Sequence, residues 1–320
     1  MSERVFLITG AHGCIGAWAV HELVGQGERV VTFDLSTDSR RIALLLPPQQ
    51  LDAVPHIAGD ISDLDAVERP LDEHGITNVI HLAALQVPFC RADPPLGARV
   101  NVLGTVNVFE AVRRRLDRMA PVVYASSIAA FDAPGDAPEP SMSGHPGTIY
   151  GVYKRANEGT ASVYRAESGV PSVGLRPHTV YGVGRDQGLT SAPTTAMLAA
   201  AAGVPYTIPY GGAAQLQSAQ DVARAFIAAS LSGSGEATVH NLPGPSVSIQ
   251  EVIDAIAEAV PGAAIGFEDT PLPFPEDADA GSFADLVPGF TTTPLREGVR
   301  STVERFRALL ADGRISTPTS

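Results

Sequence analysis

The sequence predicts an α/β protein with a doubly wound parallel sheet and a smaller, mostly C-terminal second domain. Three observations support this fold class. Short, almost continuously apolar runs alternate with helical periods over the first half of the chain, as in parallel strands covered on both faces. A glycine-rich turn follows the first apolar run. Beyond about residue 179 the segments become irregular and rich in glycine, proline, alanine and threonine.

The apolar runs predict six strands, with helices between and after them. The strands are expected at residues 4–9, 29–34, 54–60, 76–84, 120–127 and 169–177. Helices are expected at 14–26, 63–74 and 96–115, and then at about 190–202, 219–232, 248–260 and 295–311. Pro94 and Pro95 precede the third helix and favour a helix start there. The stretch 133–147 is too rich in proline and glycine for regular structure and is predicted as a loop.

The length of 320 residues allows two domains. Because the pattern becomes irregular and then regular again, we expect the chain to leave the sheet domain and return to it. Residues 1–178 and about 219–242 are assigned to the sheet domain. Residues of about 179–218 and 243–320 are assigned to the second domain.

The composition excludes several classes of function. Asp and Glu outnumber Lys and Arg by 35 to 22, for a net charge of −13. A nucleic-acid or anionic-membrane surface needs a basic patch and is therefore not expected. No run of about 18 apolar residues predicts a membrane helix, and a cytoplasmic location fits. Cys14 and Cys90 have no metal-ligand spacing, so neither a metal site nor a disulfide is expected.

The glycine-rich turn predicts a dinucleotide site. Gly10, Gly13 and Gly16 lie between the first strand and the first helix, where missing Cβ atoms let backbone amides approach a pyrophosphate at the helix N-terminus. Asp34 closes the second strand, at the distance typical of a carboxylate that binds the adenosine ribose and repels a 2′-phosphate. This pattern favours NAD over NADP, although Asp34 could instead be a turn or cap residue. Arg40 and Arg41 follow Asp34, and their positive charges would weaken this preference for NAD over NADP.

Lys154 is the only lysine in the chain, and it follows Tyr150 by four residues. On a helix this spacing places the two side chains on one face. A free tyrosine has a pKa near 10 and is a poor base at neutral pH, whereas a nearby ammonium favours the phenolate. An ammonium is also a compact charge, unlike the planar guanidinium of arginine. We therefore interpret Tyr150 as an acid/base group tuned by Lys154; the alternative is a solvated surface lysine.

Three segments together resemble the extended short-chain dehydrogenase/reductase superfamily, and more closely the NAD-dependent epimerase/dehydratase family. They are the Gly-x-x-Gly-x-x-Gly turn, “YASS” after the fifth strand and “YGVYK” on the next helix. The resemblance covers most of residues 3–310. It implies a Rossmann-type cofactor domain and hydride chemistry. It also implies a homodimer formed through the helices “NVLGTVNVFEAVRRRL” and “YGVYKRANEGTASVYRA”.

The resemblance also assigns roles to individual residues. It implies that Ser127, with Ser126 as its neighbour, supplies the catalytic hydroxyl beside Tyr150 and Lys154. The cofactor contacts that it implies lie in the glycine turn, after the third, fourth and sixth strands and on the helix after strand four: His12, Cys14, Ile15, Asp60, Ile61, Leu82, Ala83, Ala84, Asn101, Pro177 and His178. His178, like His81, is a possible acid or base, but a histidine beside a buried strand is more often a packed one.

The sequence departs from the sugar-nucleotide members of this family at three places. Ile128 and Ala129 stand where the dehydratases carry an acidic pair, so dehydration is not expected. Thr179 replaces an asparagine that follows strand six. Ala214 replaces an arginine that holds the substrate diphosphate, and two negative charges without a cation would be costly to bind.

These departures favour a small polar, sugar-like substrate, such as an aldose, polyol or hydroxy acid. We predict NAD-dependent hydride transfer at a secondary alcohol, ketone or hemiacetal carbon. The alternatives are a sugar epimerase with no net redox change and a non-catalytic NAD sensor. The polar residues expected near the substrate follow strands four, five and six: Gln86, Ser126, Ser127, Thr179, Arg185 and Gln187.

Overall fold

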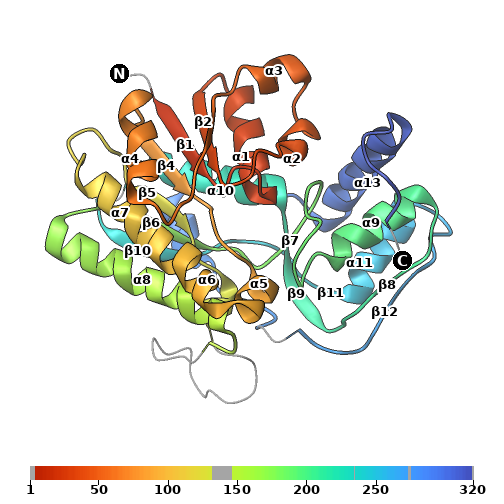
Figure 1. The fold of residues 1–320 in the computed structure, drawn as a ribbon. Helices are drawn as coiled ribbons and strands as arrows, with labels where there is room; N and C mark the ends of the chain where they lie inside the picture. Colours follow the sequence, from red (N-terminus) through yellow and green to blue (C-terminus); the bar gives the residue numbers. More distant parts are fainter. Residues whose placement is uncertain (1–3, 132–145, 234, 273–274, 319–320) are drawn as a thin grey trace.

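Seven parallel strands form the central sheet of the computed structural model, which describes residues 4–131, 146–233, 235–272 and 275–318 (Figure 1). The spatial order is β10-β6-β5-β4-β1-β2-β3, with every neighbouring pair parallel. This is the doubly wound order, in which the strand sequence reverses beside the first strand. The strands are β1 Val5–Thr9, β2 Arg29–Asp34, β3 His56–Ala58, β4 Asn78–His81, β5 Val122–Ala125, β6 Ser172–Arg176 and β10 Ala237–Asn241. The predicted fold class is confirmed.

Helices cover both faces of this sheet (Figure 1). All five residues of β1 are buried; Phe6 and Ile8 pack into one apolar layer, and Val5 and Leu7 pack into the other. The first layer is closed by α1 (Cys14–Gly25) and α10 (Ala219–Ser232). The second is closed by α4 (Leu64–Glu73), α7 (Gly104–Arg113) and α8 (Ile149–Ser168). Burial on both faces explains why these strands are continuously apolar.

Most of the elements that follow β6, apart from α10 and β10, gather at the right of Figure 1. A three-stranded sheet holds β7 (Thr179–Tyr181), β9 (Ala213–Ser218) and β11 (Ser246–Ser248). A two-stranded parallel pair holds β8 (Tyr206–Ile208) and β12 (Ile265–Phe267). The helices there are α9 Ala192–Ala202, α11 Ile249–Ala259 and α13 Leu295–Ala311, whereas α12 Gly281–Leu286 contacts β10. The chain returns to the central sheet for α10 and β10 and leaves it again.

The structure contains several elements that the sequence did not predict. The strand β10 was not among the predicted runs, because only its pairing with β6 makes the mixed stretch “ATVHN” extended. Four short helices were also missed: α2 Arg40–Ala43, α3 Pro48–Asp52, α5 Val87–Ala92 and α12 Gly281–Leu286. The short strands β7, β8, β9, β11 and β12 lie in segments that were predicted as irregular. The helix predicted at 96–115 begins as α6 (Pro94–Ala98), contains a π-helical turn η1 (Arg99–Leu103) and continues as α7.

Most of the loop predicted at 133–147 lies outside the described residues. None of the described helices has the length and apolar character that crossing a membrane requires.

Candidate active site

The glycine turn at the end of β1 has room only for glycine. Gly10 has φ +68°, and a Cβ there would lie 2.6 Å from the backbone nitrogen of Ala83. A Cβ on Gly16 would lie 2.4 Å from the carbonyl oxygen of Gly10. Gly13 is the N-cap of α1, so the free amides of the helix face the cavity in front of the turn. A pyrophosphate fits this cradle without any basic side chain.

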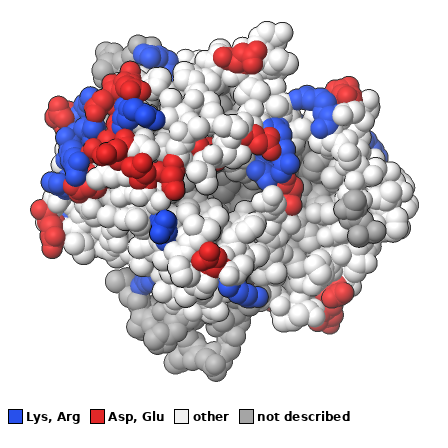
Figure 2. All heavy atoms as spheres, viewed as in Figure 1, with Lys and Arg blue, Asp and Glu red and all other residues white. Residues whose placement is uncertain are grey.

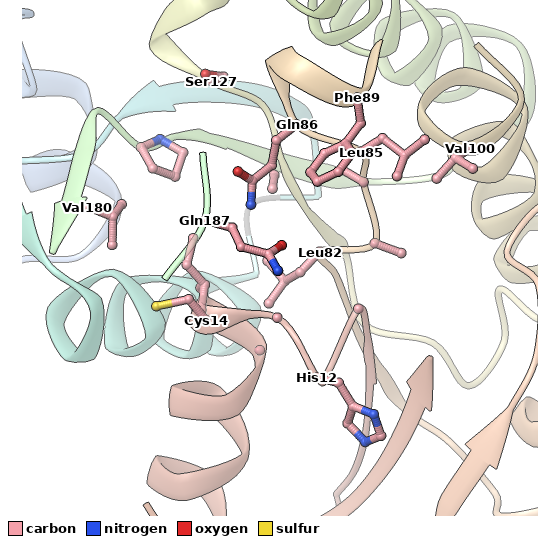
Figure 3. A pocket seen from close by; sticks show the side chains of 18 of the residues that line it. His12, Cys14, Leu82, Leu85, Gln86, Phe89, Val100, Ser127, Val180 and Gln187 are labelled. Atoms are coloured by element: carbon pink, nitrogen blue, oxygen red, sulfur yellow. The ribbon is translucent and has the colours of Figure 1, made fainter. Parts of the chain in front are cut away.

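The cavity in front of the glycine turn has a volume of about 720 Å³. In Figure 3, His12 lies near one end of it and Ser127 near the other. Sequence-predicted residues that line the cavity are Gly10, His12, Gly13, Cys14, Ile15, Gly16, Asp34, Asp60, Ile61, Leu82, Ala83, Ala84, Gln86, Ser126, Ser127, Tyr150, Lys154, Pro177, His178, Thr179, Arg185 and Gln187. Residues that the sequence reasoning did not single out also line it, including Phe89, Val100 and Leu189.

Asp34 stands at the end of β2 beside the glycine turn. Its Oδ2 accepts a hydrogen bond from the backbone of His12 at 2.9 Å, and its Oδ1 accepts one from the backbone of Ser36 at 3.0 Å. The carboxylate is thus fixed where an adenosine ribose would lie. Arg41 donates to Asp186 at 2.7 Å and to the carbonyl of His12 at 2.9 Å. Arg41 therefore already has a carboxylate partner.

Asn101 is the one predicted cofactor residue that is absent from the cavity wall. Its side chain is 1 % exposed; it accepts from the backbone nitrogen of Leu85 at 2.7 Å and donates to the carbonyl of Leu85 at 2.9 Å. It holds the segment that follows β4, and so acts on the cavity through Leu85. The π-helical turn places its carbonyl oxygen where Asn157 and Thr105 donate to it.

Tyr150 and Lys154 lie on one face of α8, and Ser127 follows β5 opposite them. The hydroxyl of Ser127 caps the short turn at Ile128 and forms a hydrogen bond with the Tyr150 side chain. Lys154 is 3 % exposed, its Nζ donates to the carbonyl of Ala125 at 2.7 Å, and it lies 5.5 Å from the centre of the Tyr150 ring. This lysine is buried beside the tyrosine, which excludes the solvated-surface alternative.

The ionisation of this pair differs from the sequence-based expectation. Burial raises the pKa of Tyr150 to about 12, although the hydrogen bond with Ser127 and the charge of Arg185 work against that rise. Burial also lowers the pKa of Lys154 to about 8, while Cys90 and Glu158 work against that fall. Lys154 therefore remains mostly protonated at neutral pH. The expected depression of the Tyr150 pKa is therefore wrong for the protein alone, because loss of solvation outweighs the effects of the neighbouring groups.

Two candidate acid/base histidines are held by neutral hydrogen bonds. Burial lowers the pKa of His81 to about 3, and its two ring nitrogens contact Thr9 at 2.7 Å and Thr105 at 3.1 Å. The Nε2 of His178 lies 2.6 Å from the carbonyl of Pro275, and burial also lowers its pKa. Both rings are packed groups that connect neighbouring segments.

Ser126, one of the predicted substrate contacts, has a structural hydrogen bond instead. It is 2 % exposed and donates to Glu158 at 2.5 Å. Glu158 also accepts two hydrogen bonds of 2.7 Å from Arg176. This buried group was missed from the sequence, although Glu158 follows Lys154 by four residues and Arg176 ends β6. It supports the backbone from which Ser127 projects.

The positions that distinguish the sugar-nucleotide enzymes are buried and uncharged here. Ile128 and Ala129 are 4 % and 5 % exposed and offer no proton-transfer group beside Ser127. Ala214 is 1 % exposed within β9 and packs into the core. Thr179 is also buried, at 1 % exposure, beside His178.

The fold and this cavity define a class of protein: an enzyme with a dinucleotide-binding fold and with a tyrosine and a lysine in the wall of its cavity. Residues 6–240 match the NAD dependent epimerase/dehydratase family. The chain belongs to this family, and NAD is its cofactor.

Several similar proteins are known by name. The UDP-glucose 4-epimerase of Mycolicibacterium smegmatis is 30% identical and covers 94% of this chain and 98% of its own. In contrast, the chain spans less than half the length of the UDP-glucuronate 4-epimerases 4 and 5 of Arabidopsis thaliana, at 41% and 42%.

Solved structures resemble nearly the whole chain. The UDP-glucose 4-epimerase of Thermus thermophilus, a complex with NAD, is 28% identical with a TM-score of 0.75 and covers 94% of this chain and 98% of its own. An L-threonine dehydrogenase from Cupriavidus necator is 25% identical with a TM-score of 0.79 and covers 96% and 99%. Both epimerases and dehydrogenases are thus among the relatives, and NAD-dependent catalysis is common to them.

Proposed function

We propose that the protein is an NAD-dependent dehydrogenase or reductase that acts on a secondary alcohol or ketone of a small, polar, sugar-like substrate. The observation that carries this proposal is the hydrogen-bonded pair Ser127 and Tyr150 beside the buried Lys154. Bound NAD would supply the hydride acceptor for this chemistry. The glycine turn, Asp34 and the segment after β4 would hold the cofactor.

Residues of the protein then transfer the proton. The Tyr150 oxygen takes the proton of the substrate hydroxyl during oxidation and returns it during reduction. The Ser127 hydroxyl holds the substrate oxygen beside Tyr150. The Lys154 ammonium favours the negative charge that develops on the tyrosine oxygen.

A sugar 4-epimerase is the second candidate function, because a relative that covers 94% of the chain is named UDP-glucose 4-epimerase. Against a nucleotide-diphosphate substrate stands the buried Ala214, which offers no cation at the position of the family's diphosphate anchor. The apolar pair Ile128 and Ala129 argues against dehydration.

The test is an assay of aldoses, polyols, hydroxy acids and UDP-sugars with NAD. Net formation of NADH at 340 nm with an unactivated substrate supports a dehydrogenase. Conversion of a UDP-sugar to its epimer without accumulation of NADH would replace that proposal with the epimerase.

A further inference from the structure

Arg185 is a cation without a carboxylate partner in the wall of the cavity. It lies in the loop between β7 and α9; its Nη2 donates to Thr190 at 3.1 Å, and its Nε is buried with no hydrogen-bond partner. Among the described residues no carboxylate forms an ion pair with it, whereas Arg40 and Arg41 both pair with Asp186. An unpaired guanidinium N–H inside a cavity is costly unless a ligand completes it.

The charge of Arg185 acts at the reacting end of the cavity. It is close enough to Tyr150 to lower the pKa of that hydroxyl, against the larger effect of burial. It also acts on Cys14, at the start of α1. Arg185 lines the same cavity as the glycine turn and Tyr150, so a substrate that presents its alcohol to Tyr150 shares the cavity with this cation.

Gln86 supplies an unpaired acceptor next to this cation. Its Oε1 is buried with no hydrogen-bond partner. A Cβ on Gly188, which has φ +98°, would lie 2.1 Å from this oxygen and 3.2 Å from Nη2 of Arg185. Because Gly188 has no side chain, the Gln86 oxygen and the Arg185 guanidinium can both occupy the space beside it. Figure 3 shows the amide groups of Gln86 and Gln187 directed toward the middle of the cavity.

Building on the proposed function, we propose that the substrate is a small hydroxy acid whose carboxylate is bound by Arg185. The planar guanidinium forms two parallel hydrogen bonds to a carboxylate. The Gln86 oxygen accepts a hydrogen bond from a substrate hydroxyl. In the oxidation, the carbinol carbon loses a hydride to NAD and its hydroxyl loses a proton to Tyr150, so a keto acid forms and the carboxylate is unchanged.

A monoanion suits this cavity better than a phosphate ester or a diphosphate. The other cations in its wall have other partners: Lys154 donates to the Ala125 carbonyl and faces the Tyr150 ring, and Arg40 and Arg41 pair with Asp38 and Asp186. One free guanidinium balances one carboxylate charge. A phosphate dianion would leave excess negative charge in a partly closed, low-dielectric site.

The first experiment compares matched acids and alcohols. Glycerate, erythronate, gluconate and L-threonine are assayed with NAD against glycerol, erythritol and sorbitol. We expect kcat/KM for the preferred acid to exceed that of its uncharged counterpart at least 10-fold. A methyl ester and a phosphorylated form of that acid serve as charge controls, and both should be poorer. A preference for alditols or for the phosphorylated form would overturn the proposal.

The second experiment separates binding from chemistry. Arg185→Gln should weaken the binding of the acid to the enzyme–NADH complex about 10- to 100-fold, as expected for lost charge-assisted hydrogen bonds, measured by isothermal titration calorimetry. Arg185→Lys should recover part of that loss. Arg296→Gln, at an exposed ion pair with Glu258, is the matched control and should bind normally. The binding of uncharged alditols should be the same in all four proteins.

The two proposals fail differently. If acids bind through Arg185 but no compound yields NADH, dehydrogenation is wrong and carboxylate recognition holds. If Arg185→Gln binds acids like the wild type, or loses acid and alditol binding equally, Arg185 is not a carboxylate anchor. Circular dichroism and NADH affinity check that each variant is folded.

Discussion

Lys154 is buried next to Tyr150, and its substitution tests whether it tunes the tyrosine. Burial raises the pKa of Tyr150 to about 12, and we expect the Lys154 ammonium, with the positive nicotinamide of bound NAD, to favour the phenolate during the reaction; Lys154→Met removes the first of these charges. We expect kcat at pH 7 to fall on the order of 10²–10³-fold and to recover in part at pH 9–10 as the phenolate forms. Lys154→Arg keeps the charge in a different place and should lose less. Measurement of kcat against pH gives both comparisons.

Tyr150→Phe is the control for this prediction. It has no proton acceptor at that position, so its activity should not recover at high pH. If Lys154→Met had the pH profile of the wild type, Lys154 would only bind the cofactor.

Asp34 and the paired arginines predict a preference for NAD. The carboxylate would repel a 2′-phosphate, and Arg40 and Arg41 are bound to Asp186. We expect kcat/KM for NAD to exceed that for NADP at least tenfold, about 1.4 kcal/mol. Asp186→Asn should release the two arginines and reduce this ratio without a change in the hydride step. Equal use of both cofactors by the wild type would refute the role given to Asp34.

At the residue level, the sequence identified the site residues that lie close to one another along the chain. The glycine turn and the pair Tyr150 and Lys154 follow from short-range periodicity, and all of them line the cavity. The contacts between distant segments could not be predicted. Asp186 meets Arg41 only because the loop after β7 folds over α2, and Ser126 is held by Glu158 because α8 packs beside β5. Such partners depend on tertiary structure, which spacing does not encode.

The element α8 is joined to β6 by the buried pair of Glu158 and Arg176. Burial alone would raise the pKa of Glu158, but the hydrogen bonds and charge of Arg176, with Ser126 and Arg155, outweigh it and hold the pKa below its usual value. A carboxylate with a lowered pKa in the folded state stabilises the protein above its unfolded pKa, about 4.5. This contribution is lost as the pH falls below that value.

Glu158→Gln should therefore reduce the free energy of unfolding at pH 7 by about 2–4 kcal/mol, because it leaves the Arg176 charge buried without a counter-ion. Urea denaturation at pH 7 and pH 4 measures this effect, and the difference from the wild type should shrink at the lower pH. Glu258→Gln, in an exposed ion pair with Arg296, should change the stability little. An equally large effect at both pH values would contradict this account.

At the level of elements, the strongly apolar strands were predictable and the weakly patterned ones were not. β1 is buried on both faces and is recognisable from its composition. β10 has polar and apolar residues mixed, and it is extended only because the edge of β6 is available to it. Likewise, no local signal marks the π-helical turn at Arg99–Leu103, since it places Asn101 against Leu85, a contact from outside the helix.

At the scale of the whole molecule, α8 exposes a stripe of small apolar residues. Val152, Ala156, Gly159, Val163 and Ala166 are exposed and recur every three or four positions, which places them on one helix face. Leu103 on the neighbouring η1 is 45 % exposed. In Figure 2 the charged side chains gather over α4 and α7, while the surface over α6 and α8 carries far fewer. We propose that this stripe joins two copies of the chain.

Light scattering at micromolar concentration should give twice the chain mass of 33.3 kDa. Val152→Asp combined with Val163→Asp should shift the mass toward the monomer, because charges in an apolar interface lose solvation. Leu231→Asp, at a residue 47 % exposed on α10, is the control and should leave the mass unchanged. A wild-type mass of one chain would refute the dimer.

The position of β10 has a consequence for biosynthesis. The ribosome releases the chain from its N-terminus, so residues 4–178 emerge while the open edge of β6 still lacks its partner at Ala237–Asn241. An unpaired edge readily adds a strand from another molecule. We expect a fragment that stops at residue 178 to precipitate, and one that extends through residue 242 to be more soluble. The central sheet would thus be protected from aggregation only after the ribosome has translated the segments between β6 and β10 and then β10 itself.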